Sequence, residues 1–168
     1  LPFGYDHKYT YSHLGYNLKI TDIQAACGLA QLEKAEQFIQ ARKDNYVFLK
    51  GCLKPCEEFI HLPHPTEHSD PSWFGFPITL KENCPVNRLD LLNYLDANRV
   101  GTRLLFAGNL TRQPYMVGAK YRISGNLTNT DIVMNNTFWI GVQPSLTKEM
   151  LEFSALKIKT FLGVTGVN

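Results

Sequence analysis

Hydrophobic and polar positions follow a helical period in the stretch that begins at Thr21. The apolar face of this stretch consists of Ile23, Ala26, Cys27, Ala30, Ala35, Phe38, Ile39 and Tyr46. Spacings of three and four residues are typical of one side of an α-helix. Thr21 and Gln24 have the spacing of a capping box, in which each side chain binds the other residue's backbone amide. We predict one long helix over residues 21–50 that ends near Gly51.

The second half of the chain has the pattern of a small sheet with helices. Short runs of aromatic and β-branched residues alternate with stretches in which leucines share one face. Pro77 lies in the first of these runs and indicates an edge strand or a bulge. Asn98 is a candidate left-handed helix cap. We predict strands over residues 73–80, 100–106 and 137–142, and helices over residues 85–98 and 147–162.

This order of elements predicts an α+β fold, in which a long N-terminal helix precedes a small β-α-β-β-α sheet domain with helices on one face. The expected parts are an arm with the long helix (1–52), a proline-rich connector (53–72) and the small domain (73–168). Residues 107–136 read as a loop. Structureless loops of that length are uncommon unless they are functional, so we predict that it lines a site.

Composition narrows the class of protein. The formal net charge is +2, and cations and acids are interspersed along the chain, which argues against a nucleic-acid surface. We expect no membrane span, because no run approaches the roughly 18 apolar residues that a bilayer requires. No secretory signal is visible, so we expect a cytoplasmic protein with reduced cysteines. The chain begins with Leu1, and we expect it to be a processed or excised piece.

Two groups of polar residues are candidates for binding an anion. Tyr16, Asn17 and Lys19 lie just before a predicted helix start, where free amides and the helix dipole favour phosphate. The alternative is a turn-forming asparagine beside a surface lysine. Arg103 and Arg112 flank the end of a predicted strand, and arginine binds diphosphates through paired hydrogen bonds. The alternative is that these arginines form surface ion pairs.

Other candidate chemistry is weak. His61, His64 and His68 lie near Cys52 and Cys56, but a zinc site needs four converging ligands, and the intervening prolines break any shared helical face. We therefore predict no metal site. No nucleophile elbow, phosphate-binding loop or dinucleotide fingerprint is present, so the residues alone predict no complete catalytic set.

Several segments carry a family resemblance. They are residues 15–34 (GYNLKITDIQAACGLAQLEK), 42–46 (RKDNY), 101–115 (GTRLLFAGNLTRQPY) and 144–150 (PSLTKEM). Together they resemble, in order, the carboxy-terminal part of fold-type-I sugar aminotransferases that depend on pyridoxal phosphate (PLP). Residues 5–9 (YDHKY) and 106–114 (FAGNLTRQP) are most similar to one branch, the CDP-4-keto-6-deoxy-glucose 3-dehydrases of lipopolysaccharide and O-antigen biosynthesis.

The resemblance implies a reaction whose catalytic groups lie mostly outside this chain. In that branch pyridoxamine phosphate (PMP) activates a CDP-linked 4-keto sugar, a histidine in place of the usual lysine removes a proton, and the C3 hydroxyl leaves. A two-iron two-sulfur cluster, reduced by a flavin iron–sulfur reductase, supplies electrons. The family's catalytic histidine and cluster cysteines lie upstream of the matched segments. The resemblance therefore implies a fragment that is inactive alone and binds neither group by itself.

The resemblance also assigns roles to residues of this chain. Asn17 and Lys19 would reach the cofactor phosphate of a second subunit in a homodimer formed through the arm and the long helix. Four residues would lie near the nucleotide sugar: Tyr16, Arg103, Asn109 and Arg112. No catalytic residue and no metal ligand is expected here. A PLP-dependent nucleotide-sugar aminotransferase and a non-catalytic sugar-binding or assembly module are the alternative functions.

Overall fold

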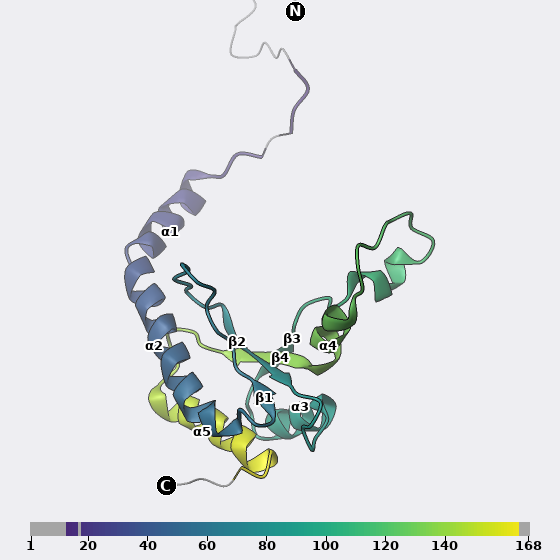
Figure 1. Ribbon diagram of the computed structural model, residues 1–168. Helices are drawn as coiled ribbons and strands as arrows, with labels where there is room; N and C mark the ends of the chain where they lie inside the picture. Colours follow the sequence, from purple (N-terminus) through teal and green to yellow (C-terminus); the bar gives the residue numbers. More distant parts are fainter. Residues whose placement is uncertain (1–12, 17, 165–168) are drawn as a thin grey trace, which may run out of the picture. The chain divides into compact units, whose positions relative to one another are not determined.

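The computed structural model describes residues 13–16 and 18–164, and the chain divides into two units, Leu1–Ala35 and Glu36–Asn168. The first unit contains helix α1, Asp22–Leu32. The second contains the four strands and most of the helical residues (Figure 1).

Helix α1 begins at the capping box that the sequence predicts. The Gln24 amide donates to Thr21 Oγ1 at 3.3 Å, and the Thr21 amide donates to Gln24 Oε1 at 2.9 Å. Asp22 in the first turn suits the positive end of the helix dipole. No described residue of α1 is buried, so local capping accounts for where this helix starts.

The prediction of one continuous helix over residues 21–50 is wrong. Helix α1 ends at Leu32, and α2 spans Ala35–Leu53. The Lys34 amide donates to the Gln31 carbonyl at 3.0 Å, three residues back, which tightens the turn between the two helices. The charged pair Glu33–Lys34 interrupts the apolar face at this point, so no packing favours continuity of the helix.

Helix α2 also passes Gly51, where the sequence indicated its end. It continues through Leu53 into a short 3-10 turn, Lys54–Cys56. Leu53 and Cys56 are both fully buried. Burial of these two side chains outweighs the intrinsic helix cost of one glycine, which is about 1 kcal/mol.

The sheet is antiparallel, with strand order β1-β2-β4-β3. Its strands are β1 (Ile60–His61), β2 (Gly75–Leu80), β3 (Thr102–Leu104) and β4 (Thr137–Gly141). Strand β1 was not predicted, because two residues show no periodicity. It pairs only with Thr79 and Leu80. Pro77, on the part of β2 that β1 does not reach, therefore has the partly open edge that a proline tolerates.

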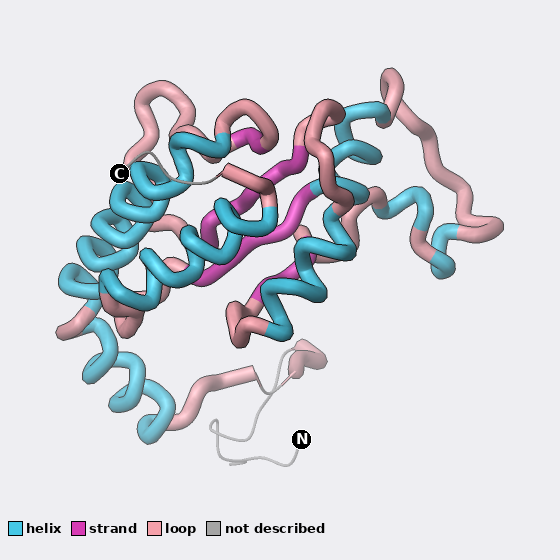
Figure 2. The backbone as a smooth tube through the Cα atoms, turned by 90° about the horizontal axis from the view of Figure 1, so that it is seen from below, coloured by secondary structure: helices cyan, strands magenta, loops and turns pink. Residues whose placement is uncertain are grey.

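One face of the sheet is covered by helices, as the sequence predicts. Phe76, Ile78 and Leu80 of β2 alternate with less buried residues, and Phe138 and Ile140 do the same on β4. Figure 2 shows α3 (Arg88–Ala97) and α5 (Lys148–Phe161) crossing this face. Helix α2 adds its own buried side chains to the same core, namely Tyr46, Leu49 and Leu53. This single core fixes the sheet on which the candidate site lies.

Two further expectations need correction. Residues 107–136 are not all loop, because Thr128–Asn136 forms helix α4 and two 3-10 turns precede it. Helix α4 has no buried residue, so it lacks the periodic apolar face from which a helix is predicted. Asn98 is not left-handed, since its φ is −94°. Arg99 takes that conformation instead, with φ 61°, while the Asn98 side chain donates to the Tyr94 carbonyl.

Candidate functional site

The face of the sheet opposite the helices carries a row of side chains across three strands. Arg103 of β3 pairs with Trp139 of β4, which pairs with Pro77 of β2. Residues directly opposite each other in antiparallel strands point to the same face. This open face contributes no apolar residue to the buried core of the described chain, so its side chains are available for contacts.

Trp139 is held flat against the open face. Its indole lies over Gly75, where a Cβ atom would stand 2.3 Å from the indole Cε3. The indole N–H donates to the Leu104 carbonyl at 3.1 Å, and the ring of Phe74 lies 5.1 Å away, centroid to centroid. An apolar cavity of about 170 Å³ lies at this face. The residues that line it are Trp73, Phe74, Gly75, Pro77, Leu105, Phe106 and Trp139.

Arg103 is the exposed cation of this face. Its Nη1 donates to the neighbouring Thr102 carbonyl at 2.9 Å. Within residues 13–16 and 18–164, no carboxylate forms an ion pair with it. Among the described residues, Arg103 therefore does not form the surface ion pair of the alternative interpretation, and its guanidinium keeps donors for an anion.

Asn109 and Arg112 converge on Asp131 of α4. Arg112 Nε donates to Asp131 Oδ1 at 2.7 Å and Nη2 donates to Oδ2 at 2.6 Å. Asn109, only 2% exposed, donates from Nδ2 to the same Oδ1 at 2.7 Å and accepts from the Thr111 amide and hydroxyl. The hydrogen bonds from Arg112 and Asn109 lower the pKa of Asp131 to about 2. At Arg112, the surface ion pair of the alternative interpretation is therefore present.

Asp131 was missed from the sequence, although a signal was present. It is the only acidic residue between positions 107 and 136, a segment that contains three cations, Arg112, Lys120 and Arg122. A lone carboxylate among cations is a candidate ion-pair partner. Trp139 was missed for another reason, since only strand register brings it beside Arg103.

The residues before α1 are placed only in part. Tyr16 is 93% exposed, and Lys19 is also exposed. Asn17 lies outside the described residues. Thr21 and Gln24 use each other in the capping box, so the amides of those two residues are already engaged. The predicted role of this segment in holding a phosphate stays a prediction.

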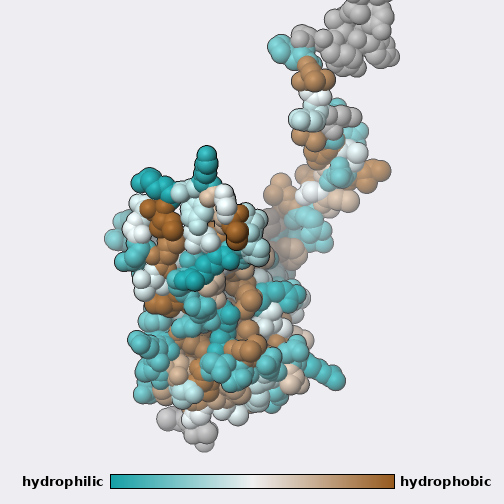
Figure 3. Space-filling view, turned by 90° about the vertical axis from the view of Figure 1, so that its right-hand side faces the viewer, coloured by the Kyte–Doolittle hydropathy of each residue, from teal (hydrophilic) through white to brown (hydrophobic). Residues whose placement is uncertain are grey.

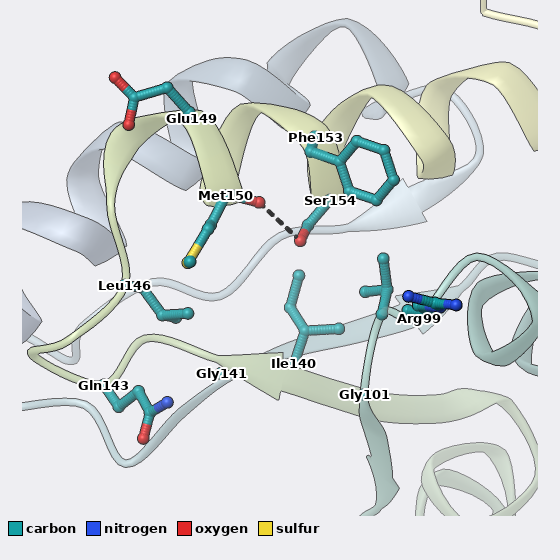
Figure 4. Close-up of a pocket in the computed structure, with 11 residues that line it drawn as sticks. Arg99, Gly101, Ile140, Gly141, Gln143, Leu146, Glu149, Met150, Phe153 and Ser154 are labelled. Atoms are coloured by element: carbon teal, nitrogen blue, oxygen red, sulfur yellow. Dashed lines mark hydrogen bonds between the residues drawn. The ribbon is translucent and has the colours of Figure 1, made fainter.

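A larger cavity of about 550 Å³ lies between the end of β4 and α5, but none of the predicted site residues lines it. Figure 4 shows its mainly apolar wall, with Ile140, Leu146 and Met150 drawn around it. The Ser154 hydroxyl donates to the Met150 carbonyl at 2.9 Å within α5. These residues form no arrangement of acid, base and nucleophile.

Cysteines and histidines do not cluster in the part of the chain that the structure describes. No group of three or more His, Cys, Asp or Glu side chains there could hold a metal ion, and the four cysteines are free. Burial raises the pKa of the Cys56 thiol to about 11. His64 Nδ1 lies 3.0 Å from Lys50 Nζ, and His68 forms an exposed contact with Glu67. The described residues of this chain therefore do not fit an iron–sulfur cluster.

The small antiparallel sheet with helices on one face gives this domain the fold of solved aminotransferase-type structures. A family model described as "DegT/DnrJ/EryC1/StrS aminotransferase family" matches residues 2–155, and the chain belongs to this family. Within the described residues, no helix is long and apolar enough to cross a membrane.

Three similar proteins refine the comparison. The chain is 63% identical to the lipopolysaccharide biosynthesis protein RfbH of Salmonella typhimurium, over 98% of this chain and 38% of that protein. It is 49% identical to the dTDP-4-dehydro-2,6-dideoxy-D-glucose 3-dehydratase of Saccharopolyspora spinosa, over 96% of this chain and 35% of that protein. The structure of an E. coli GDP-4-keto-6-deoxy-D-mannose-3-dehydratase with bound hydrated PLP superposes with a TM-score of 0.82 at 22% identity, covering 90% of this chain and 39% of that one. The chain thus spans less than two fifths of the length of each of these three proteins.

Proposed function

We propose that this chain forms the carboxy-terminal part of a PMP-dependent nucleotide-sugar 3-dehydrase, which removes the C3 hydroxyl of a CDP-linked 4-keto-6-deoxy sugar for O-antigen biosynthesis. The observation that carries the proposal is the 49% identity, along nearly the whole chain, to a protein named as a 3-dehydratase. The 63% identity to a lipopolysaccharide biosynthesis protein supports the same pathway class. Because the relatives are far longer, the catalytic groups are assigned to the rest of the full-length polypeptide.

Arg103 is the residue of this chain best suited to the substrate. It is exposed, it has no carboxylate partner among the described residues, and it stands on the open face beside Trp139. A guanidinium binds a diphosphate through paired, charge-assisted hydrogen bonds. We therefore assign Arg103 to the diphosphate of the nucleotide sugar.

Asn109 and Arg112 have a different place in the proposal. Burial of Asn109 and its bonds to Asp131 and Thr111 favour a positioning role over direct contact with the sugar. Arg112 uses Nε and Nη2 on Asp131, which leaves Nη1 for a substrate oxygen. Together they hold the segment after β3 against α4, next to the strand that carries Arg103.

The cofactor phosphate is assigned to the segment before α1. Asn17 offers an amide and Lys19 an ammonium, which is donor chemistry that fits a phosphate. PMP, when bound, supplies the amino group that activates the sugar carbonyl. Tyr16 would lie on the substrate side of the same segment. In this proposal the phosphate belongs to the second subunit of a homodimer formed through the arm and the segment predicted as the long helix, which contains α1 and α2. A flavin iron–sulfur reductase acts as cytoplasmic partner, and any iron–sulfur cluster is held outside this chain.

The test uses the full-length polypeptide that contains this sequence. It is incubated with PMP, a reducing system and CDP-4-keto-6-deoxyglucose, and the product is analysed by mass spectrometry. A 3-dehydrase yields a product lighter by one oxygen atom. An aminotransferase, the alternative function, instead yields an amino sugar when PLP and glutamate are supplied. Formation of the amino sugar without the deoxygenated product would reject the dehydrase assignment.

A further inference from the structure

Helix α4 stands on the outside of the domain, together with the segment that precedes it. Figure 1 shows both projecting away from the sheet, and Figure 3, which looks onto that side, shows brown patches scattered among the teal. No residue of α4 is buried, so this helix lacks the apolar contacts that hold α3 and α5 to the core. The position of α4 therefore depends on a few specific contacts at its ends and along one side.

Arg88 supplies the contact at the C-terminal end of α4. It is the first residue of α3, and its Nη1 donates to the Met134 carbonyl at 2.6 Å and to the Thr137 carbonyl at 3.0 Å. The last carbonyls of a helix lack amide partners within the helix and form the negative end of its dipole, so a guanidinium suits them. No carboxylate forms an ion pair with Arg88 in the part of the chain that the structure describes. The two carbonyls therefore offset the cost of burying this cation in part.

Arg88 itself is carried by an element that the core holds firmly. Leu91 and Leu95 of α3 are fully buried, and Asn87 caps the helix by accepting from the Asp90 amide at 2.9 Å. Arg88 lies between this cap and the buried face of the helix. Its guanidinium thus joins the end of an exposed helix to a buried one.

Two positions on α4 connect this contact to the candidate site. Asp131 accepts hydrogen bonds from Arg112 and Asn109. Met134 lies against Gly108, where a Cβ atom would stand 2.4 Å from Met134 Cγ. Asp131 and Met134 are three residues apart, so they lie on the same side of the helix. A shift of the C-terminal end of α4 would therefore also move the carboxylate that orients Arg112.

We propose that Arg88 is a positioning residue for the nucleotide-sugar site, which acts through α4 and Asp131 on Arg112. In this inference Arg88 does not contact the substrate, because its Nη1 is engaged by the two carbonyls at the end of α4. Its effect is to fix the direction of Arg112 Nη1, the nitrogen that Asp131 does not bind. The inference rests on the proposed function, which supplies the substrate oxygen that Arg112 contacts.

The test is a kinetic double-mutant cycle in the full-length polypeptide that contains this sequence. Arg88→Met should raise KM for the nucleotide sugar about tenfold with little change in kcat, because a misplaced Arg112 weakens binding throughout the reaction. In combination with Arg112→Met it should raise KM no further, since the contact through which Arg88 acts is then already lost. Arg88→Lys should bring KM back to within about threefold of the wild type, because one nitrogen serves both carbonyls and an ammonium has enough donors to do the same.

Asn98→Ala is the matched control. Asn98 Nδ2 donates to the Tyr94 carbonyl at 2.8 Å, so this change also removes a side-chain bond to a carbonyl at a helix C-terminus, but at the opposite end of α3 from Arg88. It should leave KM unchanged. Hydrogen exchange without substrate is the second measurement. The amides of residues 131–136 should exchange about tenfold faster in Arg88→Met and at the wild-type rate in Asn98→Ala.

Three outcomes overturn the inference. The first is a double variant in which the two effects on KM multiply, because Arg88 would then act independently of Arg112. The second is exchange in α4 of Arg88→Met at the same rate as in Asn98→Ala. The third is a failure of Arg88→Lys to recover KM. KM is taken from whichever reaction the polypeptide performs, dehydration or amino transfer, so an amino-sugar product rejects the proposed function while the cycle still measures the role of Arg88.

Discussion

Arg112 and Asp131 are joined by two parallel hydrogen bonds, Nε to Oδ1 at 2.7 Å and Nη2 to Oδ2 at 2.6 Å. The pair connects the 3-10 turn after β3 with helix α4, nineteen residues further along the chain. Paired geometry makes such a contact stronger than an ordinary surface ion pair. The segment between β3 and α4 is thereby fixed at both ends, although none of the α4 residues is buried.

The first prediction concerns the pH dependence of this pair. The Arg112 and Asn109 hydrogen bonds lower the pKa of Asp131 from 3.8 to about 2. A depressed carboxyl pKa stabilises the folded state above its unfolded value, and that stabilisation is lost as the pH falls from about 4 through 2. Asp131→Asn should therefore lower Tm at pH 6, and the difference from the wild type should shrink towards pH 2. A difference that does not depend on pH would contradict this linkage.

Gly75 should not tolerate a methyl group. A Cβ atom there would meet the Trp139 indole at 2.3 Å, so Gly75→Ala should destabilise the fold by about 1–3 kcal/mol in urea unfolding. Gly51→Ala is the control, because no atom lies within 4 Å of its added Cβ and the residue is inside α2. It should stabilise by about 0.5–1 kcal/mol. If both substitutions changed the free energy of unfolding in the same direction, the contact with Trp139 would not be the reason that Gly75 excludes a side chain.

Tyr46 should anchor the proline-rich connector to α2. Its hydroxyl donates to the Pro63 carbonyl at 2.5 Å, and its ring stacks on Trp73 with centroids 4.5 Å apart. Tyr46→Phe keeps the stacking and removes the hydrogen bond, at a cost of about 1 kcal/mol. Hydrogen exchange should become faster at the connector amides around Pro63 while the sheet amides stay protected. Equal acceleration in the sheet would argue for a general loss of packing.

The cysteines should differ in reactivity. Cys56 is fully buried, and burial raises the pKa of its thiol to about 11, whereas Cys27 is exposed. Because the thiolate is the reactive form, a thiol reagent at pH 8 should modify Cys27 within seconds and Cys56 only after the fold opens. Mass spectrometry of labelled peptides measures both rates. Rapid labelling of Cys56 under native conditions would show that the α2 terminus opens readily.

Arg103 provides the functional prediction. In the full-length enzyme, Arg103→Met should raise KM for the nucleotide sugar at least tenfold with little change in kcat, because a diphosphate contact contributes to binding throughout the reaction. Arg103→Lys should recover part of the loss. Lys54→Met removes an exposed cation from the turn after α2 and should change neither constant. An equal rise in KM in both methionine variants would indicate a general charge effect.

Local pattern was sufficient for several elements. The Thr21–Gln24 capping box, the alternation of β2 and the apolar face of α5 appear in the structure where they were predicted. These features depend on residues within a few positions of one another, so the sequence displays them directly. Strand β1 and helix α4 lack such a signature, because one is two residues long and the other buries no side chain.

The candidate site shows which features the residues themselves predicted and which depended on the tertiary structure. Residue types and motifs were enough to select Arg103, Asn109 and Arg112 and to point to the family. They left open whether each arginine would pair with a carboxylate. Folding resolved that choice, because Asp131 reaches Arg112 across nineteen positions while strand register places Arg103 beside Trp139. Hydrophobic periodicity is local and can be read along the chain, whereas the partner of a charge depends on which distant segments the core brings together.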